Sequence, residues 1–262
     1  MSVRNTFRLL IVALVSAGAL ACWAEAPARP GVGRPRTSEQ TGDEFYPTWA
    51  VTARYLRPLM VLDTDSALGR LNQHPKALRL IDVARVHGHL CDGLVTSWVE
   101  LSAALGALFP NGVVDRTDVR VVSKNGPCWA DAAAWMTGAR PNQGTLILDN
   151  SVGTDFVVQR ISTRQVVRVA LRPGLYPADL TALEAHIRSL RARGGAVTAD
   201  EIDRFEREAD AYSRRLLNTP PLHAVALTRP ADFAFPTKSP DPLAARSDII
   251  DRDAPRSRSA EK

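Results

Sequence analysis

The chain has 262 residues, of which 45% are hydrophobic, and this size and composition are typical of a protein that buries one substantial core. Its 33 basic and 28 acidic residues give a formal net charge of +5, and the basic residues form no block with interleaved aromatic residues. We therefore expect no nucleic-acid partner.

The first predicted element is an export signal over residues 1–21. A short cationic segment precedes an uncharged apolar run at residues 9–21, which is too short to span a bilayer and is typical of a secretory signal peptide. Small residues on either side of Leu20 provide a cleavage site directly before Cys22. We expect a periplasmic or secreted protein, with a lipid anchor at Cys22 as an alternative, although Leu20 stands one place too late for the usual lipoprotein pattern.

Both ends of the chain differ in composition from its middle. Residues 22–44 and 236–262 are rich in proline and charge and carry little that could be buried. They are predicted to be a flexible linker and a disordered tail. Between them we expect one folded domain, residues 45–235, without an internal repeat.

The first two helices predicted in this domain each begin at a cysteine. After Cys91, apolar residues recur through residues 94–108 at spacings of four and three, which indicates an amphipathic helix. Residues 118–124 are rich in β-branched residues and predict a strand, which an Asn-Gly-Pro sequence ends. A second helix follows from Cys128 and ends at Gly138, a natural C-terminal cap.

Three strand-like runs follow, at residues 144–150, 154–162 and 164–171, and their short polar connections predict an antiparallel meander. Two apolar stripes separated by a Gly-Gly turn then predict a helical hairpin, in which Thr198 and Glu201 have the spacing of a capping box. The expected fold class is α+β, with an antiparallel sheet meander, two helices that carry the site and a C-terminal helical hairpin.

The segment RVHGHLCDG, residues 85–93, contains the densest group of metal-ligating residue types. His87, His89 and Cys91 occupy every second position, and in an extended segment their side chains would project from the same side of the backbone. The positive end of a helix dipole stabilises a thiolate. We therefore expect the pKa of both Cys91 and Cys128 to be lowered at their helix starts.

Two interpretations of the cysteine pair stay open. A disulfide is the simplest one in an oxidising compartment, whereas the neighbouring histidines favour a metal site. Asp131 lies one helical turn after Cys128 and faces the same side. It either belongs to the site or satisfies N–H groups at the helix start.

The order of these motifs resembles the FmdE family, which is named for formylmethanofuran dehydrogenase. HGHLCDGL at residues 87–94 matches the family's H-G-H-x-C-P-G motif, which opens a helix. The family's second block is a cysteine followed three residues later by Asp-Ala and then by Thr-Gly, and it is matched at Cys128, Asp131 and Thr137. The resemblance covers residues 75–171.

The resemblance implies an α+β core that binds zinc or another divalent transition metal through residues of the two blocks. The ligands so implied are His89, Cys91 and Cys128, while His87 is either a fourth ligand or a residue that orients one. Three protein ligands would leave an open coordination position. Asp92 stands where the family usually has proline, as a ligand, a proton carrier or a helix cap.

These observations leave three functions open. The first is an exported metal-binding protein, the second an accessory or carrier protein for a metal or metallated cofactor, and the third a thiol redox protein that uses Cys91 and Cys128. Whether the protein is an enzyme stays open. The expected partners are a small molecule or a metallated cofactor, with homodimer formation also open, and a membrane only through a lipid at Cys22.

Overall fold

The computed structural model describes residues 45–66 and 69–236, and every structural statement below concerns these residues. The predicted export signal, the linker, the tail after residue 236 and Cys22 lie outside them.

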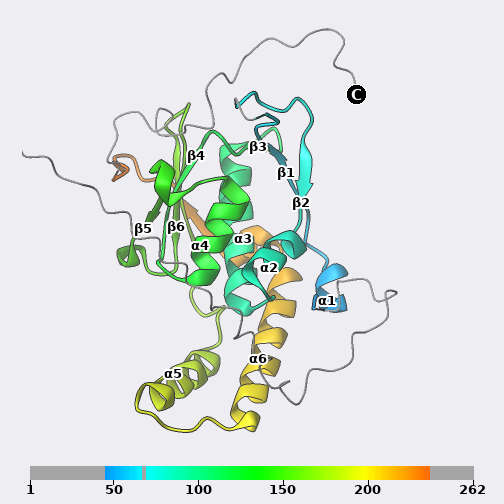
Figure 1. Ribbon diagram of the computed structural model, residues 1–262, viewed down its shortest axis with the longest axis vertical. Coiled ribbons are helices and arrows are strands. Elements are labelled where there is room, and N and C mark those ends of the chain that lie inside the picture. Colours follow the sequence, from blue (N-terminus) through cyan, green and yellow to red (C-terminus); the bar gives the residue numbers. More distant parts are fainter. Residues whose placement is uncertain (1–44, 67–68, 237–262) are drawn as a thin grey trace, which may run out of the picture. The chain divides into compact units, whose positions relative to one another are not determined.

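A five-stranded mixed sheet forms one layer of the domain (Figure 1). Its strand order is β5–β4–β6–β7–β8, and all neighbouring strands are antiparallel except β4 and β5, which are parallel. The bounds are β4 (Val119–Ser123), β5 (Leu146–Leu148), β6 (Phe156–Arg160), β7 (Val166–Leu171) and β8 (Val225–Thr228).

The α+β class is therefore confirmed, and of the predicted antiparallel meander the pair β6–β7 is present. The run at residues 144–150 takes a different place, because its strand β5 lies at the edge beside β4 rather than beside β6. The chain passes through α4 (Pro127–Thr137) between β4 and β5. A helical crossover of this kind joins parallel strands, whereas a tight turn joins antiparallel ones.

The helix α3 (Asp92–Leu108) is the centre of the core. It packs against β6 and β7 on one side and against α4 and α6 on the other, and Figure 1 shows α3 and α4 on the same side of the large sheet. Every residue from position 93 to 101 is buried. A helix that is apolar around most of its surface is typical of such a central position.

The second face of the large sheet is covered by a short C-terminal segment. Val122, Val157 and Val166 point to this face and form a small cluster with Phe235, against which Phe233 also packs. The strands therefore bury side chains on both faces.

A second, three-stranded sheet was not predicted from the sequence. Its order is β2–β1–β3, with β1 and β2 antiparallel and β1 and β3 parallel. The elements of this region are α1 (Thr48–Val51), β1 (Leu59–Leu62), β2 (Lys76–Leu78), α2 (Leu80–His87) and β3 (Val113–Asp115). Two short 3₁₀ helices, η1 (Pro141–Gln143) and η2 (Asn150–Val152), flank β5.

The C-terminal helical hairpin is present as predicted. It consists of α5 (Ala178–Ala192) and α6 (Ala199–Leu217), and the capping box between Thr198 and Glu201 forms at the start of α6. The second half of α6 buries Tyr212 and Leu216, and the short helix α7 (Pro221–Ala224) leads to β8.

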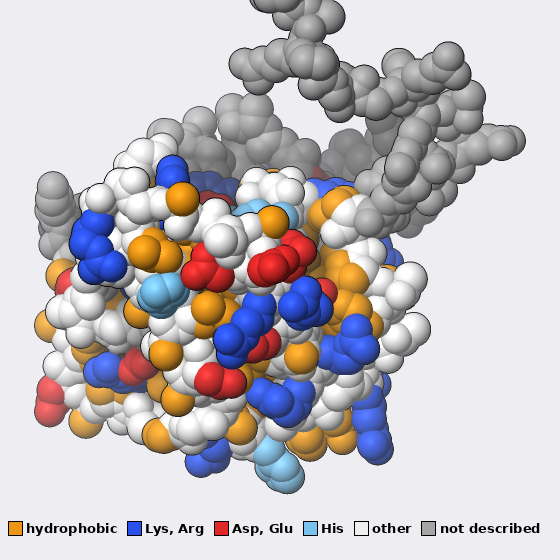
Figure 2. Space-filling view, turned by 90° about the horizontal axis from the view of Figure 1, so that it is seen from below, with side chains coloured by type: hydrophobic (Ala, Val, Ile, Leu, Met, Phe, Trp, Pro, Cys, Tyr) orange, Lys and Arg blue, Asp and Glu red, His pale blue; other side chains and the backbone are white. Residues whose placement is uncertain are grey.

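Charged side chains of both signs share the surface of this region. Arg188 pairs with Glu184 on α5, and Arg204 pairs with Glu208 on α6. The face seen from below likewise has basic and acidic side chains interspersed (Figure 2). Within the described ranges, no helix is both long enough and apolar enough to cross a membrane.

Candidate metal centre

A helix, a glycine turn and a second helix bring the first three candidate ligands together. His87 is the last residue of α2, Gly88 caps this helix with a left-handed φ of 99°, and Cys91 is the N-cap of α3. The expectation of an extended segment is therefore wrong, because the α2 helix runs up to His87 itself. The positive φ at position 88 favours glycine, and it reverses the chain so that His89 and Cys91 return towards His87.

The second cysteine reaches the same place from α4. Gly126 is the N-cap of α4 and Pro127 its first residue, so Cys128 lies in the first turn, as predicted. The N-terminus of α3 approaches it closely at Gly93. A Cβ atom at position 93 would lie 3.0 Å from the Cys128 sulfur, so a larger residue there would push the thiol away.

Three donor atoms form a triangle with nearly equal sides. The Cys91 and Cys128 sulfurs are 3.5 Å apart, and the His87 Nε2 atom lies 3.8 Å from the first and 3.7 Å from the second. Tetrahedral zinc, with bonds of about 2.3 Å to sulfur and about 2.0–2.1 Å to nitrogen, needs ligand atoms separated by about 3.5–3.8 Å. The residues present therefore fit a metal of this class.

His89 lies at the solvent side of this triangle. Its ring centroid is 4.7 Å from that of His87, and ligand atoms of His87, His89 and Cys91 all lie within 4.8 Å of one another. His89 is exposed, whereas the His87 side chain is only 4% exposed. Of the two histidines, His87 is therefore the one whose ring nitrogen lies near both thiols.

Asp131 orients His87. Its Oδ2 atom lies 2.8 Å from the His87 Nδ1 atom. A proton on Nδ1, donated to this carboxylate, leaves the Nε2 lone pair directed at the two sulfurs, which is the usual arrangement behind a metal-binding histidine. Of the two interpretations of Asp131, the site is therefore the one that this contact favours.

The two thiols differ in acidity because they are so close. Their mutual hydrogen bond lowers the pKa of Cys128 and raises that of Cys91, and burial raises the pKa of Cys91 further. The hydrogen bond between the thiols, rather than the helix start, is thus the main cause of the lowered pKa of Cys128, and the pKa of Cys91 changes in the opposite direction. At 3.5 Å a second negative charge is unfavourable without a cation between the sulfurs, so loss of a proton from one thiol makes loss of the other proton harder.

Asp92 is held by a residue that no sequence motif marks. The Tyr176 hydroxyl donates a hydrogen bond of 2.5 Å to its Oδ2 atom, and the pKa of Tyr176 is raised by burial and by this bond. Tyr176 packs edge-on against Tyr212, whose hydroxyl shares a 2.9 Å hydrogen bond with Thr96. Asp92 and Tyr176 are 84 positions apart in the chain, and no local pattern predicts such a contact.

The centre thus combines two sulfur donors, an oriented imidazole and an exposed second imidazole at the meeting point of three helix ends. Such a set can bind a transition metal and, without one, can undergo thiol chemistry.

Comparison with known proteins agrees with this construction. None of the curated proteins matches the sequence. The family model described as "FmdE, Molybdenum formylmethanofuran dehydrogenase operon" matches residues 86–225, which is more than half of the 262 residues. The matched range contains His87, His89, Cys91, Cys128 and Asp131. On this match, and with both motif blocks gathered in one place, the chain belongs to the FmdE family.

Proposed function

We propose that the protein is an exported metal-binding protein that holds a divalent transition metal, in the first place zinc, through His87, Cys91 and Cys128. The observation that carries the proposal is the triangle of donor atoms, with sides of 3.5, 3.7 and 3.8 Å. Two thiolates and an imidazole are ligands that suit zinc better than calcium or magnesium.

His89 supplies the fourth position in this proposal. Because it is exposed and sits on the ring of His87, it can bind the metal or yield to an incoming ligand. A site whose fourth position opens is the kind that acts on a substrate, and the metal would supply Lewis-acid chemistry there. The same exchangeable ligand also suits a carrier that delivers a metal or a metallated cofactor.

The compartment is a separate part of the proposal. It rests on the sequence of residues 1–21, which has the pattern of an export signal, and on Cys22 as the residue that would carry a lipid. Fractionation of cells that express the full chain tests it, and cytoplasmic recovery of the uncleaved chain would contradict it.

Metal content tests the central claim. Protein purified without added metal and then reconstituted with zinc should bind one ion per chain, and Cys91→Ser or His87→Ala should lose most of it. Replacing zinc by cobalt should give a visible thiolate-to-metal absorption band that disappears in Cys91→Ser. His186→Ala is the matched control, because His186 lies on α5 beside Glu201. Equal metal content in the wild type and Cys91→Ser would refute the proposal.

The distance between the sulfurs also favours a second candidate function, in thiol redox chemistry. Cys91 and Cys128 are both free thiols in the structure, and their sulfurs need to approach from 3.5 Å to about 2.05 Å to form a bond. In this reaction the two thiols give up two electrons and two protons to oxidised glutathione, which becomes two reduced molecules.

Thiol counting in glutathione buffers separates the two functions. A redox protein should change reversibly between a form with two free thiols and a disulfide form with none. The midpoint of this change should lie near the redox potential of its compartment. A metal protein should resist this oxidation while the ion is bound, and should lose its metal when oxidised.

A further inference from the structure

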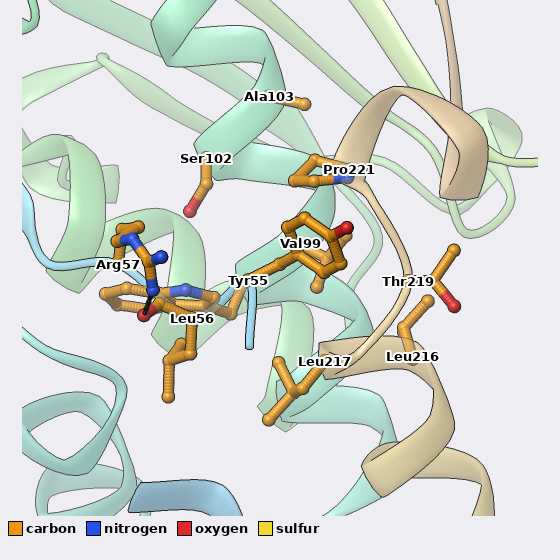
Figure 3. Close-up of a pocket in the computed structure, with 11 residues that line it drawn as sticks. Tyr55, Leu56, Arg57, Val99, Ser102, Ala103, Leu216, Leu217, Thr219 and Pro221 are labelled. Atoms are coloured by element: carbon orange, nitrogen blue, oxygen red, sulfur yellow. Dashed lines mark hydrogen bonds between the residues drawn. The ribbon is translucent and has the colours of Figure 1, made fainter. Parts of the chain in front are cut away.

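A pocket of about 170 Å³ lies beside α3, away from the metal centre. Trp98 and Val99 of α3 line it, together with Leu216 and Leu217 at the end of α6. Figure 3 shows Val99, Leu216 and Leu217 around the pocket. A cavity of about 150 Å³ with apolar walls can hold benzene. The pocket is therefore large enough for a compact apolar group of about that size.

The pocket is distinct from the centre at the start of α3. Trp98 lies seven residues after Cys91 and Ser102 eleven, so both are on the same face of the helix. With a rise of about 1.5 Å per residue, they lie roughly 10 and 16 Å further along its axis. None of the candidate metal ligands lines the pocket.

Two polar groups at the pocket, the Ser102 hydroxyl and the Arg57 guanidinium, lack a hydrogen-bond partner and a carboxylate partner respectively among the residues that the structure describes. The Ser102 hydroxyl is buried and makes no hydrogen bond to any described residue. Figure 3 shows it pointing to the side on which the Arg57 guanidinium lies. Arg57 is exposed and donates a hydrogen bond to the Leu56 carbonyl, but no carboxylate of the described residues forms an ion pair with it.

The chemistry of the lining selects one class of ligand. Apolar walls favour a hydrophobic body, an unpaired guanidinium favours an anionic end, and a hydroxyl without a partner can donate to that same end. No aspartate or glutamate among the described residues lines the pocket to oppose a negative charge. A cationic ligand would therefore find no carboxylate partner among the lining residues.

We propose that this pocket binds a small carboxylic acid with a compact aromatic or branched apolar body. The apolar body lies between Trp98 and Leu216, and the carboxylate accepts hydrogen bonds from Arg57 and Ser102. This binding does not depend on the metal.

Benzoate, with neutral benzamide of nearly the same shape, tests the proposal. In the full chain, benzoate should bind saturably and at least about fivefold more tightly than benzamide, since hydrogen bonds to charged groups are the stronger ones. Arg57→Gln should remove this preference. Arg188→Gln, which removes one positive charge on the exposed surface of α5, should leave it unchanged.

The place of binding is tested separately, because a carboxylate can also bind a metal. The indole N–H resonance of Trp98 should shift with benzoate while that of Trp129, beside Gly93 at the metal centre, should not. The metal-free variant Cys91→Ser should bind benzoate as the wild type does. Ala103→Leu, which extends a side chain from the pocket wall, should abolish binding.

Equal affinity for benzoate and benzamide, or no binding of either, would overturn the proposal. So would a shift at Trp129 instead of Trp98, or loss of binding in Cys91→Ser. The resonance measurement uses the unaltered chain, so the test stands even if Ala103→Leu fails to fold.

Discussion

At the scale of single residues, Gly93 shows how closely the two halves of the metal centre meet. Gly93→Ala would usually stabilise a helix, because glycine costs about 0.5–1 kcal/mol relative to alanine. Here the new Cβ would lie 3.0 Å from the Cys128 sulfur and 3.2 Å from its Cβ atom. We expect the thiol to move by a few tenths of an ångström and zinc affinity to fall by about tenfold, a loss of about 1.4 kcal/mol.

Gly106→Ala is the matched control for Gly93→Ala. Gly106 lies in the same helix, is exposed, and would bring its Cβ into open space. It should raise the free energy of unfolding by up to about 1 kcal/mol and leave zinc affinity unchanged. Chelator competition and urea unfolding measure both quantities, and an unchanged zinc affinity in Gly93→Ala would contradict the close-packing argument.

Asp131 should act on the metal through His87. Asp131→Ala removes the acceptor at 2.8 Å that fixes the ring, and losses of this kind typically lower metal affinity by about 10–100-fold. Asp131→Asn keeps an acceptor oxygen, so its metal affinity should lie between those of the wild type and Asp131→Ala. Asp203→Ala, an exposed carboxylate on α6, is the control in the same chelator competition and should have no effect.

At the scale of elements, the sequence predicted those whose signal is local. The α3 and α4 helices, with their cysteines at the starts, and the capped α6 helix follow from periodicity, cap residues and breakers. The short strands β1 to β3 carry too few residues for a periodic signal, and the place of β5 depends on pairing with β4. The orientation of the His87 ring escapes local patterns for a related reason, since it comes from Asp131, 44 positions later.

The segment that ends at Phe235 should stabilise the large sheet from its second face. Phe235 is 9% exposed, packs on Val122, Val157 and Val166, and has the Arg120 guanidinium 4.5 Å above its ring. Phe235→Ala should lower the free energy of unfolding by about 2–4 kcal/mol, somewhat less than a central core substitution. Metal content should not change, because the metal centre lies on the opposite side of the large sheet from Phe235.

The comparison for Phe235→Ala is Leu222→Ala, which truncates an apolar side chain that is 65% exposed. Its effect in the same urea titration should stay within about 0.5 kcal/mol. A similar loss in both variants would mean that the Phe235 segment contributes no specific packing.

At the scale of the whole molecule, α3 links the metal centre, the core and the pocket. Cys91 caps its start beside Cys128 of α4, its middle packs in the core against β7, and Trp98 and Val99 line the proposed carboxylate pocket. The middle also contains a fully buried carboxyl group, Glu100, whose Oε1 atom accepts a 2.6 Å hydrogen bond from the Leu171 N–H. Its Oε2 atom has no partner among the described residues, and burial raises its pKa well above the ordinary value.

This burial should make stability depend on pH. A carboxyl group with a raised pKa in the folded state is protonated there at pH values where the unfolded chain is already ionised, so unfolding releases a proton. The contribution of Glu100 to stability is complete below its ordinary pKa of 4.5 and declines as pH rises from there towards the raised value. Glu100→Gln keeps the acceptor for Leu171 and cannot ionise.

We therefore expect Glu100→Gln to raise the free energy of unfolding by about 1–3 kcal/mol at neutral pH, which urea unfolding measures. This gain in stability should shrink towards pH 4.5. The difference between the two proteins is the quantity to measure, because the other titrating groups cancel in it. Glu206→Gln, at an exposed position of α6, should give a difference near zero at every pH. An advantage of Glu100→Gln that is the same at pH 4.5 and pH 8 would show that ionisation of this buried group is not its source.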